Sequence, residues 1–144
     1  MKKVSHSEKE TFDFAKNLAA KAKGGQVYAL SGDLGAGKTV FARGFAAGLG
    51  IKRGVNSPTF VLMKVYPIKK HPTIKHLCHV DAYRLKTTGD LEAIGITDYL
   101  GAKDSICLIE WPERVKELLP VKAKSIFLKH LDENTREIQT KNQP

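Results

Sequence analysis

No stretch of this sequence approaches the roughly 20 consecutive apolar residues that a membrane-spanning helix needs, so we expect no membrane association. The N-terminus leads into polar residues and not into an apolar core, which argues against a signal peptide. Cysteine is scarce: Cys78 and Cys107 are the two in the chain, and neither lies among ligands at metal spacing. We therefore expect two buried, reduced thiols in predicted strands and a cytoplasmic protein.

The composition is that of an ordinary soluble chain with a basic surplus. Of the 144 residues, 42% are hydrophobic and 27% are charged, and we expect a single domain over residues 1–144. The formal net charge of +9 favours an acidic partner, such as a nucleotide, RNA or an acidic protein surface. A lysine-rich solvated surface explains the charge equally well, because no dense basic run stands out.

The most specific pattern in the chain is Gly32-Asp33-Leu34-Gly35-Ala36-Gly37-Lys38-Thr39, which matches a phosphate-binding P-loop. Gly35 and Gly37 allow the backbone to curl so that its N–H groups face phosphate oxygens. Lys38 brings a positive charge to the β- and γ-phosphates, and the Thr39 hydroxyl can coordinate Mg²⁺. The residues predicted to bind the nucleotide at this loop are Asp33, Gly35, Ala36, Gly37, Lys38, Thr39 and Val40.

The elements around this motif predict an α/β fold, a single P-loop NTPase-like domain with a mixed central sheet flanked by helices. A strand over 26–30 enters the loop and a helix over 38–49 leaves it, which is the context that the motif requires. Helical stretches are also predicted over 90–100 and 112–119. The other predicted elements are a first helix capped by Ser7, strands over 60–66, 74–80 and 105–109, and a terminal hairpin of 125–131 and 136–140.

Two carboxylates follow predicted strands directly: Asp81 ends one, and Glu110 ends the compact apolar run of another. In open α/β sheets, ligands bind outside the carboxyl ends of the strands. Either residue could hold Mg²⁺ through water, and either could orient a nucleophilic water. The alternative for each is a carboxylate that caps the turn after its strand.

Several other side chains allow both a functional and a structural interpretation. Thr59, after Ser-Pro, is either a sensor of the γ-phosphate or Mg²⁺, or an ordinary strand-starting threonine. Trp111, the single tryptophan, either packs near the nucleotide or a partner, or is a half-buried aromatic. Arg84 faces phosphate or forms an ion pair. His76 and His79 face opposite sides of one strand, so we interpret them as ordinary strand residues and not as metal ligands.

Four segments together resemble one family. They are Gly-Asp-Leu-Gly-Ala-Gly-Lys-Thr at 32–39, Asn-Ser-Pro-Thr-Phe at 56–60, His-Val-Asp-Ala-Tyr-Arg-Leu at 79–85 and Ile-Glu-Trp-Pro-Glu at 109–113. In this order they are similar to the TsaE (YjeE) family of small bacterial P-loop ATPases. The resemblance covers most of the chain. It implies a role in making threonylcarbamoyladenosine next to the anticodon of tRNAs that read codons beginning with A.

The resemblance also implies roles for individual residues. Lys38 and Thr39 bind the phosphates of ATP and Mg²⁺, Thr59 is a switch-like threonine, and Trp111 lies beside the site. Asp81 is the Walker B-type carboxylate near Mg²⁺, and Glu110 is an acid needed for ATPase activity. The expected catalytic residues are therefore Lys38, Asp81 and Glu110, and the expected metal ligands are Thr39, Asp81 and Glu110.

The same resemblance implies that the chain does not itself transfer the carbamoyl group. It implies instead that the chain joins a TsaD–TsaB heterodimer, meets tRNA indirectly or weakly, and resets or activates that complex by ATP turnover. We expect slow hydrolysis of ATP by the chain alone and stimulation by these partners.

Three other functions compete with this interpretation. A small-molecule kinase on the same fold usually needs an arginine-rich lid, and the arginines of this chain are not clustered along it. A GTPase typically uses an Asn-Lys-x-Asp motif, and the sequence has none. A nucleotide- or RNA-binding module without turnover is suggested by the charge, but the chain lacks the aromatic platform of an RNA-recognition fold. The dispersed arginines are Arg43, Arg53, Arg84, Arg114 and Arg136.

Overall fold

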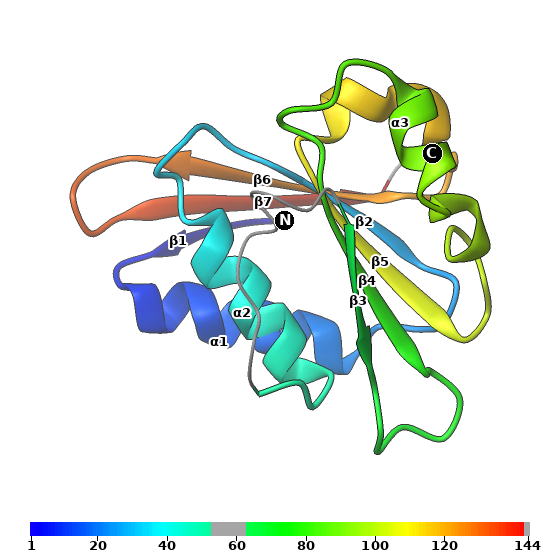
Figure 1. Ribbon diagram of the computed structural model, residues 1–144. Coiled ribbons are helices and arrows are strands. Elements are labelled where there is room, and N and C mark those ends of the chain that lie inside the picture. The colour runs from blue at the N-terminus through cyan, green and yellow to red at the C-terminus, as the bar shows by residue number, and fades with distance from the viewer. Residues whose placement is uncertain (53–62, 143–144) are drawn as a thin grey trace.

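The described residues form a seven-stranded sheet with the strand order β1-β7-β6-β2-β5-β4-β3 (Figure 1). The structure is a computed structural model and describes residues 1–52 and 63–142, so Thr59 and the segment 56–60 lie outside the described residues. The strands are β1 (Lys2–Ser5), β2 (Val27–Ser31), β3 (Met63–Pro67), β4 (His76–Asp81), β5 (Ser105–Glu110), β6 (Lys124–His130) and β7 (Arg136–Asn142). The α-helices are α1 (Glu8–Ala20), α2 (Lys38–Gly48) and α3 (Thr88–Ala93), and the 3₁₀ segments are η1 (Ile96–Asp98) and η2 (Pro112–Leu118).

The sheet has a parallel centre and antiparallel margins. Strands β6, β2, β5 and β4 run parallel, whereas β7 and β3 pair antiparallel with the outer two of them and β1 pairs antiparallel with β7. All six residues of β5 are buried, as its unbroken apolar run predicts. The expected α/β fold with a mixed sheet is thus confirmed.

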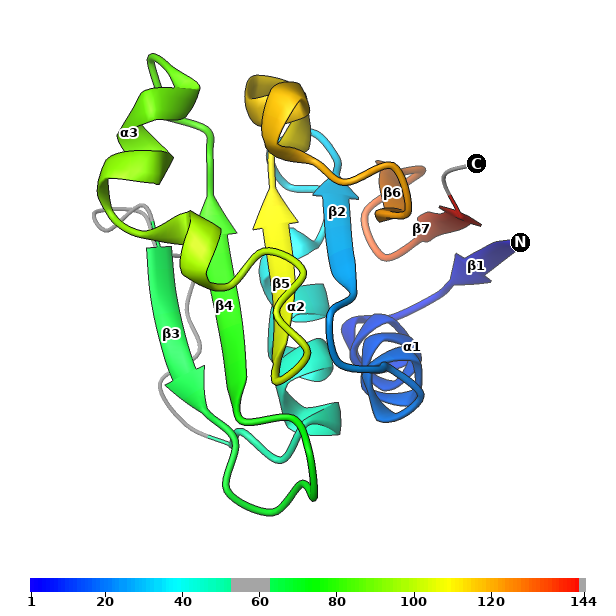
Figure 2. The ribbon, with the colours of Figure 1, turned by 90° about the vertical axis from the view of Figure 1, so that its right-hand side faces the viewer.

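Helices cover both faces of the sheet (Figure 2). On one face, α1 and α2 pack over a core in which Phe41 and Phe45 of α2 meet Leu30 of β2. On the other face, Leu91 of α3 and Val115 of η2 belong to a second core that also holds both cysteines. The thiols are buried and unbridged, as expected. None of the helices in the described part of the chain has the length and apolar character that crossing a bilayer requires.

The local structure differs from the expectations, or adds to them, in three places. The single helix predicted over 90–100 is broken at Gly95, whose φ of 94° lies in the left-handed region, so α3 and η1 are separate. The helical stretch predicted over 112–119 is present as the 3₁₀ segment η2, within which Val115 departs from helical geometry. Strand β1 was not predicted: its short polar sequence becomes a strand only because β7, from the far end of the chain, offers an edge to pair with.

Helices α1 and α2 approach closely at two glycines of α2. A Cβ atom on Gly44 would collide with the backbone carbonyl of Phe12, and one on Gly48 would collide with that of Lys16. Both carbonyls belong to α1, and backbone cannot move aside as a flexible side chain can. The position of α2, which begins at the P-loop, therefore depends on these small residues.

We expect Gly44→Ala to lower the free energy of unfolding by about 1–3 kcal/mol, the usual cost of overpacking a core. The matched control is Gly89→Ala in α3, where the nearest atom to an added Cβ is Thr87 Oγ1 at 3.5 Å. That change should be neutral or stabilising by up to about 1 kcal/mol, since alanine is the better helix former. Urea unfolding followed by circular dichroism measures both. Equal stability of the two variants would contradict the close-approach argument.

Candidate functional site

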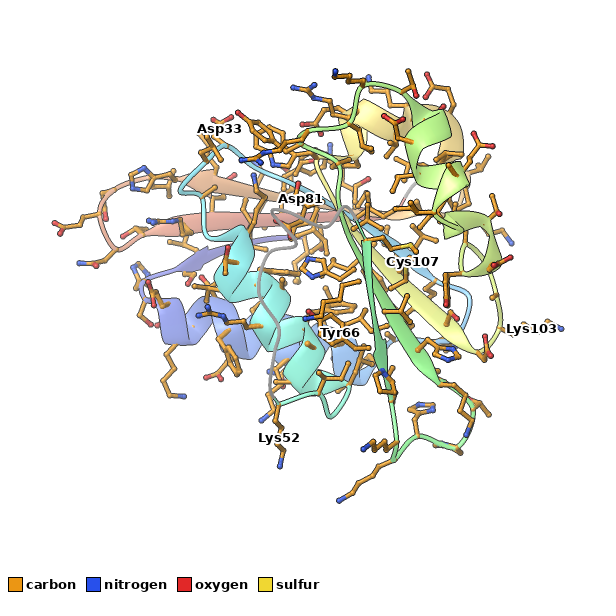
Figure 3. The ribbon with its side chains drawn as sticks, in the orientation of Figure 1. Asp33, Lys52, Tyr66, Asp81, Lys103 and Cys107 are labelled. Carbon is orange, nitrogen blue, oxygen red and sulfur yellow. The ribbon has the colours of Figure 1, made fainter. Side chains whose placement is uncertain are left out.

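A cavity of about 500 Å³ lies where the loop between β2 and α2 meets the carboxyl ends of β4 and β5. Its walls include most of the residues that the sequence predicted: Gly35, Gly37, Lys38, Thr39, Val40, Asp81, Glu110 and Trp111. Asp33 and Ala36 do not line it. Figure 3 shows Asp33 on the loop and Asp81 where β4 ends, on the side of the sheet facing that loop. Asp33 is exposed, and Ala36 is buried in the core.

The loop has the backbone that its glycines predict. Gly35 and Gly37 have φ values of 82° and 98°, which side chains other than glycine rarely adopt. Gly37 is the N-cap residue of α2, and none of the side chains in residues 1–52 and 63–142 caps this helix end. The first N–H groups of α2 are therefore left to a ligand, and the helix dipole favours an anion there.

Lys38 is buried, with 7% of its surface exposed, although it carries a charge. Its Nζ donates a hydrogen bond to the carbonyl of Gly32 and lies 3.7 Å from the centre of the Trp111 ring. Burial lowers the pKa of this ammonium group, while the charges of Glu110 and Asp81 act in the opposite direction. A cation in this setting lacks a full hydration shell, so a polyphosphate is a favourable partner for it.

The two strand-end carboxylates are neighbours. Asp81 of β4 is the register partner of Glu110 of β5, and Leu30 at the end of β2 pairs with Glu110 from the other side. One oxygen of Asp81 accepts the N–H of Tyr83 at 3.0 Å, so Asp81 does cap the following turn. Glu110 is 2% exposed, and its Oε2 lies 2.6 Å from Nε2 of His79.

Trp111 is the one described non-glycine residue with a positive φ, at 58°. This conformation turns the chain sharply after Glu110, and the Trp111 N–H still bonds to the carbonyl of Leu30 at 3.3 Å. The indole contacts Tyr83, with ring centres 4.9 Å apart. The tryptophan is half-buried, as the structural interpretation of it predicts, and it also lines the cavity; its packing against a nucleotide stays a prediction.

Sequence reasoning missed some residues of the site. Arg136, 101 residues from Gly35, donates to the Gly35 carbonyl at 3.2 Å and lines the cavity together with Arg84. The view of the arginines as dispersed is thus wrong for these two. No local pattern points to Arg136. For His79 the sequence did contain a signal. His79 lies two residues before Asp81, so the two side chains are on the same face of the strand.

The residues expected to hold a metal are too few to bind Mg²⁺ by themselves, and they fit it when a phosphate supplies further oxygen ligands. Among the described residues, no three histidine, cysteine, aspartate or glutamate side chains gather closely enough to bind a metal. Thr39, Asp81 and Glu110 nevertheless line one cavity. Mg²⁺ commonly takes one or two carboxylates and completes its shell with water and substrate phosphates, so this oxygen set fits it.

Comparison with known proteins places the chain in a family. The model for "Threonylcarbamoyl adenosine biosynthesis protein TsaE" matches residues 5–138. The tRNA threonylcarbamoyladenosine biosynthesis protein TsaE of Bacillus subtilis (strain 168) is 43% identical over 129 residues, which cover 90% of this chain and 77% of that protein. The TsaE protein of Treponema pallidum (strain Nichols) is 38% identical over 138 residues, covering 96% and 98%.

A solved structure agrees with these relatives. The crystal structure of Bacillus subtilis YdiB superposes with a TM-score of 0.82 at 36% sequence identity, covering 100% of this chain and 86% of that one. The fold, the four motifs and the length of the match all point the same way. The chain belongs to the TsaE family of tRNA threonylcarbamoyladenosine biosynthesis proteins.

Proposed function

We propose that the chain binds Mg-ATP in this cavity and hydrolyses it to ADP and phosphate. The observation that carries the proposal is the convergence of a P-loop with two strand-end carboxylates on one cavity of about 500 Å³. Lys38, Thr39, Asp81 and Glu110 come from three different elements, yet all four face the same space. A P-loop alone indicates phosphate binding, whereas the added carboxylates supply groups that hydrolysis needs.

Both backbone N–H groups and the Lys38 ammonium group would bind the triphosphate. The N–H groups at the start of α2 would bond to phosphate oxygens, and Lys38 would exchange its bond to the Gly32 carbonyl for the β- and γ-phosphates. Mg²⁺, when bound, neutralises charge on the β- and γ-phosphate oxygens. Thr39 and Asp81 are the residues that we propose to face it, as the family resemblance implies.

Hydrolysis would depend on Glu110. In the reaction, the oxygen of a water molecule bonds to the γ-phosphorus while the bond from that phosphorus to the β–γ bridging oxygen breaks. We propose that the Glu110 carboxylate orients the attacking water and accepts a hydrogen bond from it. Arg84 and Arg136, which line the same cavity, are placed to offset negative charge that develops on the phosphates.

ATP is the proposed nucleotide because the chain has no Asn-Lys-x-Asp motif for guanine. The two arginines in the cavity are the one feature that favours a small-molecule kinase. A kinase needs an acceptor, so release of inorganic phosphate without any added acceptor separates the two functions.

In the cell, we propose that ATP turnover by this chain supports a TsaD–TsaB complex in threonylcarbamoyladenosine modification of tRNA. The proposal rests on membership of the TsaE family and on the names of the relatives. The net charge of +9 is compatible with an acidic partner surface or with weak contact to tRNA.

We expect Glu110→Gln to lower kcat for ATP hydrolysis at least about 100-fold while ATP still binds, because the amide cannot act on water as a carboxylate does. Phosphate release measures turnover, and the fluorescence of Trp111, the single tryptophan, measures binding. Lys38→Ala is the control that should lose both. Loss of binding in Glu110→Gln would make Glu110 a metal ligand or a structural residue, and full turnover in Lys38→Ala would refute the P-loop assignment.

Arg136→Met should raise the Kd for ATP about 10-fold, which corresponds to roughly 1.4 kcal/mol, because the Gly35 carbonyl and the phosphates lose a charged donor. Lys141→Met is the matched control: it removes one positive charge from the same strand, outside the cavity. Titration of Trp111 fluorescence with Mg-ATP gives both constants. If the two variants bind ATP equally well, Arg136 has no specific role in the site.

Multi-turnover modification of tRNA by purified TsaD, TsaB and the enzyme that supplies the threonylcarbamoyl group should depend on this chain. Omitting the chain, or replacing it with Lys38→Ala, should stop modification after about one turnover per complex. Incorporation of labelled threonine into tRNA measures this. Sustained modification without the chain would contradict the proposed role, even if the chain hydrolyses ATP.

A further inference from the structure

His79 and Glu110 form a buried pair between adjacent strands. His79 Nε2 lies 2.6 Å from Glu110 Oε2, and their side chains are 1% and 2% exposed. His79 lies two residues before Asp81 on β4, so its side chain points to the face of the sheet that α1 and α2 cover. Glu110 lines the cavity and His79 does not, so the buried histidine contacts the glutamate from behind the cavity wall.

The surroundings of the imidazole indicate which nitrogen carries the proton. Nδ1 of His79 is buried and has no hydrogen-bond partner among the described residues. A buried N–H without an acceptor is costly, whereas an unprotonated ring nitrogen leaves no donor unmet. The geometry therefore favours a ring that donates from Nε2 to the carboxylate of Glu110.

This donor restricts what Glu110 can do. With Oε2 held by His79, the carboxylate keeps one orientation, and Oε1 is the oxygen that remains for a ligand in the cavity. Without His79, no hydrogen bond at Oε2 would oppose the attraction between the Glu110 carboxylate and the ammonium group of Lys38, which lines the same cavity. An ion pair with Lys38 would occupy both the carboxylate and the charge meant for phosphate.

We propose that His79 is a positioning residue for hydrolysis: it holds the Glu110 carboxylate toward the attacking water and away from Lys38. This inference rests on the proposed hydrolysis of ATP by the same site. His79 does not touch the substrate and acts only through Glu110. An ordinary core histidine at this place would instead affect stability alone.

The test compares two substitutions of His79 in the phosphate-release assay. His79→Leu removes the donor, and kcat should fall about 10- to 100-fold, the usual effect of losing an orienting hydrogen bond, while KM for ATP changes little. His79→Gln keeps an N–H that can reach Glu110, so most of kcat should return. Leu77→Val is the matched control, since Leu77 is buried on the same strand and the same face. It should leave kcat at the wild-type value.

A double mutant separates positioning from stability. Adding His79→Leu to Glu110→Gln should cause no further fall in single-turnover rate, because the group through which His79 acts is already lost. A merely structural role predicts that the two losses multiply. If the leucine variant does not fold, His79→Asn replaces it, since its amide is too short to reach Glu110.

Three results would each overturn the inference and leave the proposed function standing. The first is a wild-type kcat in a folded His79→Leu variant, and the second is an equal loss of kcat in His79→Leu and His79→Gln. The third is a double mutant in which the two losses multiply. Failure of the proposed function looks different. In that case the wild-type chain would release no phosphate that depends on Lys38, and the inference would fall with it.

Discussion

The parallel pairing of β2, β5 and β4 is the constraint on which the site depends. This pairing places the carboxyl ends of the three strands at the same edge of the sheet. Glu110 of β5 is the register partner of Leu30 on one side and of Asp81 on the other. Backbone bonds continue the alignment past the strand ends, from Trp111 to Leu30 and from Ala82 to Glu110. A shift of β5 by one residue would turn Glu110 to the opposite face and away from the loop. The register is therefore as important to function as the P-loop itself.

The site carries two opposite charges on buried side chains. Lys38 and Glu110 are both at least nine-tenths buried, and each is held by a different partner: a carbonyl for the lysine and an imidazole for the glutamate. Keeping opposite charges apart in a buried site forgoes the energy of an ion pair. The arrangement makes sense if an incoming polyanion is to meet the cation, which is the electrostatic preorganisation that catalysis of phosphoryl transfer requires.

Local patterns in the sequence predicted the fold and most of the cavity, because strands, helices and the P-loop are each encoded within a few neighbouring residues. The failures involve long-range partners. Strand β1 forms only because it pairs with β7, and Arg136 contacts the carbonyl of Gly35, 101 residues away in the sequence. The residues near β1 and near Arg136 in the sequence therefore do not predict these two contacts. His79 is a different failure: strand alternation already places it on the same face of β4 as Asp81, but its contact with Glu110 of the adjacent strand appears only in the structure.

The backbone conformation of Trp111 sets the positions of both the Glu110 carboxylate and the indole ring. A bulky residue with φ at 58° holds backbone strain, of order 1–3 kcal/mol, that persists only where the surroundings enforce it. Here the strand end must keep Glu110 facing the cavity, and the next residue must bring its ring over Lys38. A relaxed, extended continuation of β5 would carry the indole away from that lysine. The strained turn thus places the Glu110 carboxylate and the Trp111 ring on consecutive residues, and the ring lies over the ammonium group of Lys38 from α2, so the single tryptophan is in contact with the charged part of the cavity.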